Sequence, residues 1–178
     1  MKPVWYTALR KFGPGSDGWA SYLAWAKLPH LTEVVSLDII LCPPIIQELT
    51  VVDWQHNVQE DFKTVFFVDL DYLLSRVGDP AAANTIATIE EPELEDVESF
   101  RDGRFRFIGF DLIELPGTGV SALVNCGGFD RAFLPKDLNA YGLITDYAFA
   151  RVVQRRLVEQ YPGEHHAQCS LWAVWRYA

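Results

Sequence analysis

Two aspartates separated by one residue form the clearest chemical pattern in the sequence. Asp69 and Asp71 follow the apolar run of residues 65–68. On a strand, side chains two residues apart point to the same side, so both carboxylates can hold a Mg²⁺ ion beside a phosphate group. The pattern predicts a metal-dependent phosphoryl-transfer or hydrolytic enzyme with Asp69 and Asp71 as catalytic residues. The simpler interpretation, which we favour, is that the strand ends here and Asp71 caps a short helix over residues 72–77.

The same stretch resembles the first motif of the haloacid-dehalogenase-like phosphotransferases, in which an apolar strand is followed by Asp-x-Asp. The resemblance covers residues 63–72 and implies phosphoryl transfer with both aspartates at a metal site. The sequence departs from the family at Tyr72, where the family prefers Thr or Val. It also departs at Gly78-Asp79, which follows too soon to be the later acidic motif of the family. We therefore assign the chain to no known family.

A second group of candidate catalytic residues combines a thiol with an imidazole. Cys126 precedes two glycines whose N–H groups can stabilise an oxyanion, and a histidine such as His165 can act as the base. Cys169 shares a strand face with His165 but not with His166, and the spacing supplies no four-ligand zinc site. We expect no metal and no other cofactor. The alternative is that the cysteines are small core residues and the glycines form a turn.

Negative charge is concentrated in residues 79–102. This segment contains eight acidic residues and one arginine, and so carries −7 of the net charge of −9. Such a segment is usually a solvated loop, but concentrated charge also attracts a basic protein partner. An exposed tryptophan, here Trp54, is a second mark of an interface. The residues expected at the partner interface are Glu91, Glu93, Glu95, Asp96, Glu98 and Trp54.

Composition limits the classes of function. The chain has 178 residues, of which 49% are hydrophobic and 22% are charged, as in a folded single-domain protein. A net charge of −9 argues against a nucleic-acid binder, which needs clustered Lys and Arg. No apolar stretch reaches the roughly 18 residues of a membrane helix, and no signal-peptide core is present. The three widely spaced cysteines are typical of reduced thiols, so we expect a cytoplasmic protein.

Two segments have the apolar periodicity of a helix. Residues 16–28 place their apolar side chains on one face and end before Pro29. The second segment begins with a cap at Thr145 or Asp146 and carries an apolar stripe as far as residue 161. Both helices are expected to pack their apolar faces against a sheet.

Several segments have the alternation or the apolar continuity of a strand. They are residues 34–41, 63–71, 85–90, 104–115, 120–124 and 167–177. We expect residues 63–71 to form a central strand covered on both faces, because their apolar run is continuous. Residues 104–115 and 120–124 are expected to pair as a hairpin around a turn at residues 116–119.

The apolar phase slips by one residue at Gly109. Phe107 places the apolar face of this strand on odd positions, whereas Phe110 places it on even positions. A β-bulge at Gly109 returns both side chains to the core, since one extra residue restores the alternation. Four charged side chains argue against the alternative, burial of both faces. They are Arg104, Arg106, Asp111 and Glu114.

Together these patterns predict a single α+β domain spanning residues 1–178. We expect a mixed, mostly antiparallel sheet of about five or six strands with two or three helices, and a C-terminal helix followed by a C-terminal strand. The acidic residues 79–102 are expected to form a loop or excursion. The preferred function is non-catalytic protein binding, with neither a membrane nor a nucleic acid as partner. The alternative is the metal-dependent enzyme.

Overall fold

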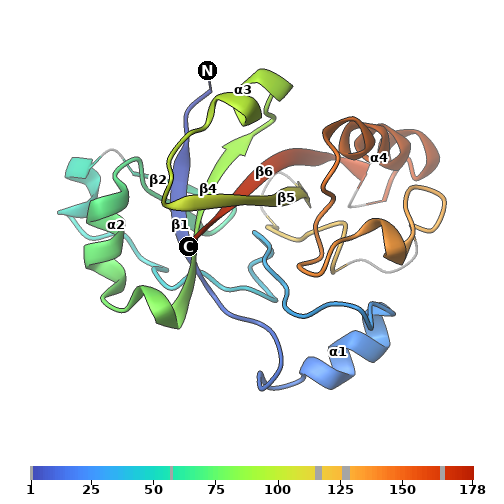
Figure 1. Ribbon diagram of the computed structural model, residues 1–178, viewed down its shortest axis with the longest axis horizontal. Coiled ribbons are helices and arrows are strands. Elements are labelled where there is room, and N and C mark those ends of the chain that lie inside the picture. Colours follow the sequence, from blue (N-terminus) through green and yellow to red (C-terminus); the bar gives the residue numbers. More distant parts are fainter. Residues whose placement is uncertain (1, 57, 115–117, 126–128, 165–166) are drawn as a thin grey trace.

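A four-stranded antiparallel sheet lies at the centre of the computed structural model, which describes residues 2–56, 58–114, 118–125, 129–164 and 167–178. The strands lie in the order β1-β4-β6-β5 (Figure 1). Their bounds are Trp5–Arg10 for β1, Ala83–Glu90 for β4, Phe105–Glu114 for β5 and Cys169–Tyr177 for β6. All neighbouring strands in this sheet pair antiparallel.

Helices and a short ribbon surround this sheet. The α-helices are α1 (Trp19–Ala26), α2 (Leu70–Val77), α3 (Leu94–Ser99) and α4 (Tyr147–Gln160), and the ribbon is β2 (Gln59–Asp61) with β3 (Thr64–Phe66). The 3-10 turns are η1 (Asp53–His56), η2 (Pro80–Ala82) and η3 (Pro135–Asp137). In Figure 1, α2 lies beside β1 and α4 lies on the other side of the sheet, beside β6. The fold is α+β, as predicted. None of the described helices is both long enough and apolar enough to cross a membrane.

The two helices predicted from periodicity are confirmed. Asp146 caps α4, because its Oδ1 accepts the Phe149 N–H at 2.6 Å. The buried stripe of α4 consists of Ala150, Val153 and Leu157. α1 follows Gly18, which has a left-handed backbone and makes no side-chain cap. The sequence patterns did not predict α3.

β6 is buried on both faces, although its sequence alternates. The Trp172 ring stacks on the Phe66 ring of the β2–β3 ribbon, with ring centroids 5.6 Å apart. On the opposite face, the Trp175 ring packs against Phe100, at the end of α3, with centroids 4.7 Å apart. The ribbon and α3 therefore cover opposite faces of the strand, and both tryptophans belong to the core.

The predicted β-bulge at Gly109 is confirmed. Along β6, consecutive residues Trp175, Val174 and Ala173 pair with Phe107, Gly109 and Phe110, so the register skips one residue of β5. Phe107 and Phe110 consequently lie on one face of the sheet, with ring centroids 5.1 Å apart. Glycine is suited to this position, because its φ of +141° is rarely adopted by other residues.

Three strand predictions are wrong. Residues 34–41 form no strand, because Ser36 and Asp38 bind backbone N–H groups of their own segment and so form turns instead of a ladder. Residues 120–124 touch β5 through an isolated bridge at Ser121, whereas the ladder partner of β5 is β6. The predicted central strand in residues 63–71 is the three-residue β3, which is buried but lies in the small ribbon. Residues 116 and 117 of the predicted turn lie outside the described residues.

Candidate functional site

Residues 50–56, termed here the Trp54 turn, present large apolar side chains to solvent. Val51 is 81% exposed, Val52 is 54% exposed and Trp54 is 59% exposed. Exposed apolar side chains that occur singly are ordinary, but a cluster of them marks a surface that binds another molecule. Tryptophan is also enriched among the residues that dominate interface energies. The turn is therefore a candidate binding surface.

The buried side chain of Asp53 fixes the conformation of this turn through hydrogen bonds. Its carboxylate is fully buried and accepts two hydrogen bonds from Arg76, at 2.8 and 3.1 Å. The Tyr72 hydroxyl donates to it at 2.8 Å, and Thr50 donates its N–H at 2.6 Å and its hydroxyl at 2.8 Å. Burial raises the pKa of Asp53, but the hydrogen bonds from Arg76, Thr50 and Tyr72 outweigh it and hold the pKa well below its usual value.

The anchor for Asp53 comes from α2. Tyr72 and Arg76 are four residues apart on this helix, so both side chains leave the same face and reach one carboxylate. The His56 ring, at the end of the turn, stacks on the Tyr72 ring with centroids 3.6 Å apart and planes 8° apart. The turn is thus ordered before any partner arrives, which reduces the conformational entropy lost on binding.

Asp69 and Asp71 do not share a strand face. Asp69 is the N-cap of α2 and accepts the Tyr72 N–H at 3.0 Å. The prediction that Asp71 caps this helix is therefore wrong. Asp71 lies in the first helical turn, is 85% exposed and pairs with Arg104 at 3.1 Å. The strand geometry on which the metal-site hypothesis depended is therefore absent. Among the described residues, no three His, Cys, Asp or Glu side chains lie close enough together to hold a metal.

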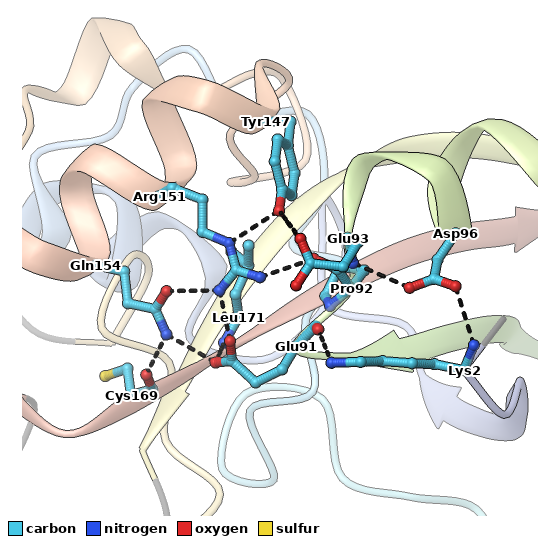
Figure 2. A network of polar contacts seen from close by, with 10 residues as sticks. All are labelled: Lys2, Glu91, Pro92, Glu93, Asp96, Tyr147, Arg151, Gln154, Cys169 and Leu171. Carbon is cyan, nitrogen blue, oxygen red and sulfur yellow. Dashed lines mark hydrogen bonds and ion pairs between the residues drawn. The ribbon is translucent and has the colours of Figure 1, made fainter.

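The acidic residues 79–102 do not form the predicted loop. They contain the central strand β4, which confirms the strand predicted at residues 85–90, and the helix α3, which was not predicted. Glu91, directly after β4, lies at the centre of a network that joins three parts of the chain (Figure 2). Its carboxylate binds Arg151 at 2.5 Å, the Gln154 amide at 2.7 Å and the Leu171 N–H at 2.6 Å. The Glu91 carboxylate thus stabilises the fold through hydrogen bonds within the chain.

The backbone of Glu91 is strained. Its φ of +46° lies in the left-handed region, which costs a residue other than glycine about 1–3 kcal/mol. Arg151 makes further hydrogen bonds in this network. Its guanidinium also donates to the Pro92 carbonyl at 2.7 Å and to the Tyr147 hydroxyl at 3.1 Å. Figure 2 shows that these groups converge from α4 and from the chain between β4 and α3. The contacts offset the strain.

The other four acids predicted at the partner interface divide into two groups. Asp96 is buried and accepts the Lys2 N–H at 2.9 Å and the Glu93 N–H at 3.0 Å, and these backbone hydrogen bonds lower its pKa. Glu93, Glu95 and Glu98 are exposed. Of the acids predicted at the partner interface, these three therefore lie at the surface.

The predicted thiol and imidazole site is only partly described. Cys126 and His165 lie outside the described residues. Cys169 is buried on β6, and burial, followed by the charges of Glu114 and Asp111, raises the pKa of its thiol to about 12. A thiol with such a pKa stays protonated near neutral pH and is a weak nucleophile.

Asp111, which the sequence predicted to be exposed on its strand, is buried and joins three segments of the chain. Asp111 of β5 is fully buried, and its carboxylate accepts the Ser36 hydroxyl at 2.5 Å and the Ser121 hydroxyl at 2.7 Å. Burial raises its pKa to about 6, although these hydrogen bonds oppose the shift. Asp111 and Glu114 are both buried, so charge on β5 did not exclude burial of both faces. Of the two hydroxyls that make this possible, that of Ser36 lies 75 residues away in sequence and that of Ser121 lies 10 residues away.

The sequence named Trp54 as a candidate but missed the residues that support it. Asp53 stands between apolar neighbours, and Tyr72 and Arg76 have helical spacing, but nothing local links the two segments. Comparison with models of protein families, with curated proteins and with solved structures finds no match to this chain. Function is therefore inferred from the side chains of the site.

Proposed function

We propose that this protein acts without catalysis, by binding a second protein through the Trp54 turn. The observation that carries the proposal is the exposure of Val51, Val52 and Trp54 on a turn held by the buried Asp53. Covering apolar surface contributes favourable free energy to association, and the affinity is what remains after the freedom lost on binding is offset. Only part of this energy is lost to ordering, because the turn is already fixed.

The charge of the molecule supports a basic partner. The chain carries a net charge of −9, and the exposed carboxylates of Glu93, Glu95 and Glu98 lie on or next to α3. Such charges act over roughly 8 Å at physiological salt, so they increase the association rate of a basic protein more than they increase its affinity. Cys42 is a buried free thiol, which supports a cytoplasmic location for this binding.

Site-specific photo-crosslinking tests the proposal. A photoreactive phenylalanine analogue replaces Trp54 in one protein and Trp25 of α1 in a control, since Trp25 is 57% exposed and so closely matched in exposure. Each protein is irradiated in a lysate of its own cells at low and at high salt. We expect a discrete cross-linked product from position 54, stronger at low salt and absent from position 25.

Two outcomes of the cross-linking experiment would contradict the proposal. If position 54 yields no product beyond that of position 25 at either salt concentration, the Trp54 turn does not bind a protein and the proposal is wrong. A product from position 54 that is equally strong at both salt concentrations contradicts the basic partner.

A further inference from the structure

We infer that the partner segment pairs a lysine or arginine with Asp69 while an apolar side chain of the same segment covers Trp54. This inference rests on the proposed function and names the chemistry of the segment that the turn binds. It is carried by the position of Asp69, by the lack of a lysine or arginine partner for it among the described residues, and by the exposed apolar residues of the two segments that meet there.

Asp69 lies at the edge of the Trp54 turn. Its Oδ2 is 4.0 Å from Nδ1 of His56, the last residue of η1, and His56 in turn stacks on Tyr72. The N-cap hydrogen bond uses the other oxygen, Oδ1, and so fixes the direction of the carboxylate. Because 49% of the side chain is exposed, Oδ2 is accessible to a donor from another molecule.

Of the basic residues that the structure describes, only the His56 imidazole lies within 4.0 Å of the Asp69 carboxylate. Within the described ranges, neither a lysine nor an arginine lies within 4.0 Å of its carboxylate. Arg76, later in α2, is committed to Asp53, and Arg104 is committed to Asp102 and Asp71. The carboxylate is therefore available to a lysine or arginine that a partner brings.

Apolar surface continues on the other side of Asp69. Val68, the preceding residue, is 40% exposed, and Trp54 lies two residues before the His56 that faces Asp69. The two segments that meet here thus combine one exposed carboxylate with exposed apolar residues. The complement of this surface is a segment that combines one cation with apolar residues, such as a basic amphipathic peptide.

Two matched substitutions isolate the charge of Asp69. Asp69→Asn removes the charge but keeps an oxygen that can accept the Tyr72 N–H, so α2 stays capped. Asp79→Asn is the control: Asp79 is also exposed and also accepts a backbone N–H, from Ala81 at 3.0 Å. Both variants change the net charge equally, so any difference between them is local to Asp69.

The probe is a library of random peptides displayed on phage, selected on the wild-type protein and counter-selected on Trp54→Ala. Enriched peptides are synthesised, and their Kd values are measured by fluorescence anisotropy. We expect Lys or Arg beside a large apolar residue, a Kd raised about tenfold or more by Trp54→Ala, and a Kd raised about three- to tenfold by Asp69→Asn. Asp79→Asn is expected to change the Kd by less than about twofold.

The outcomes separate the two proposals. Peptides that depend on Trp54 but lack basic residues, or that bind Asp69→Asn and Asp79→Asn equally, overturn the pairing with Asp69 and leave the proposed function intact. If no enriched peptide depends on Trp54, the proposed function itself fails. Val51→Ser, at an 81% exposed position, is a second turn variant in case Trp54→Ala perturbs the fold by circular dichroism.

Discussion

The backbone at Gly109 has a φ of +141°, and a Cβ atom there would lie 2.7 Å from Leu143 Cβ and 2.9 Å from the Ile144 carbonyl oxygen. Alanine must therefore strain the backbone and displace its neighbours. We expect Gly109→Ala to lower the free energy of unfolding by about 3 kcal/mol in urea denaturation. Gly103→Ala is the control, because a Cβ atom at Gly103 meets nothing within 4 Å. Equal effects of the two substitutions would contradict this account of the bulge.

Asp111 makes stability depend on pH. Its pKa of about 6 in the folded protein lies above the value of about 3.9 for an unfolded chain, so the folded state binds this proton more tightly. The resulting stabilisation is fully present below about pH 3.9 and is lost as the pH rises through about 6. Across this window it is on the order of 3 kcal/mol.

Comparison with Asp111→Asn measures this contribution. The variant has no titrating group at this position, so the free energy of unfolding of the wild type relative to the variant is expected to fall between pH 4 and pH 6.5. Urea denaturation at a series of pH values gives this difference, and other carboxylates cancel because both proteins contain them. A difference that does not change with pH would show that Asp111 does not titrate in this range.

At the scale of elements, Glu91 connects α4 to β4 and β6. Glu91→Gln keeps an oxygen for the Leu171 N–H but places an amide N–H₂ against the Arg151 guanidinium. We expect the free energy of unfolding to fall by about 1–2 kcal/mol, a modest value because the pair is partly exposed and screened by water.

Amide hydrogen exchange identifies the elements that this loss of stability affects. Exchange in Glu91→Gln is expected to accelerate in α4 more than in α2, because α4 loses its attachment to the sheet. Glu95→Gln, at an exposed position of α3, is the control and is expected to change stability by no more than about 0.5 kcal/mol. Uniform acceleration in both helices would contradict a local attachment.

For the whole molecule, the decisive strand is β6, because it pairs with two neighbouring strands of the sheet. β6 lies between β4 and β5, and Thr88 of β4 donates its hydroxyl to the Ala173 carbonyl of β6 at 2.8 Å. Without residues 169–178 both ladders disappear and the apolar faces of the sheet are exposed. We expect the shortened chain to show no cooperative unfolding transition by circular dichroism. Deletion of Ala178 alone, at the exposed end, is expected to cost about 1 kcal/mol or less. A cooperative transition in the shortened chain would contradict this role of β6.

Local patterns determined a substantial part of the fold. The helix that Asp146 begins, the alternation of β6 and the bulge at Gly109 were all predicted, because each depends on neighbours within a few residues. The exposed Trp54 was also named in advance, since a tryptophan among polar residues fits no apolar face.

Tertiary structure alone decided how the charged residues are used. Ser36 is 75 residues from Asp111, and Glu91 is 60 residues from Arg151, so no local pattern could indicate that these carboxylates have partners. The cost of burying a carboxylate depends on donors that the fold brings to it. The sequence predicted the strand at residues 85–90, which is β4, but expected a loop where α3 lies. It shows how many acidic residues the segment has, but only the folded chain separates those that stabilise the protein from those exposed at its surface.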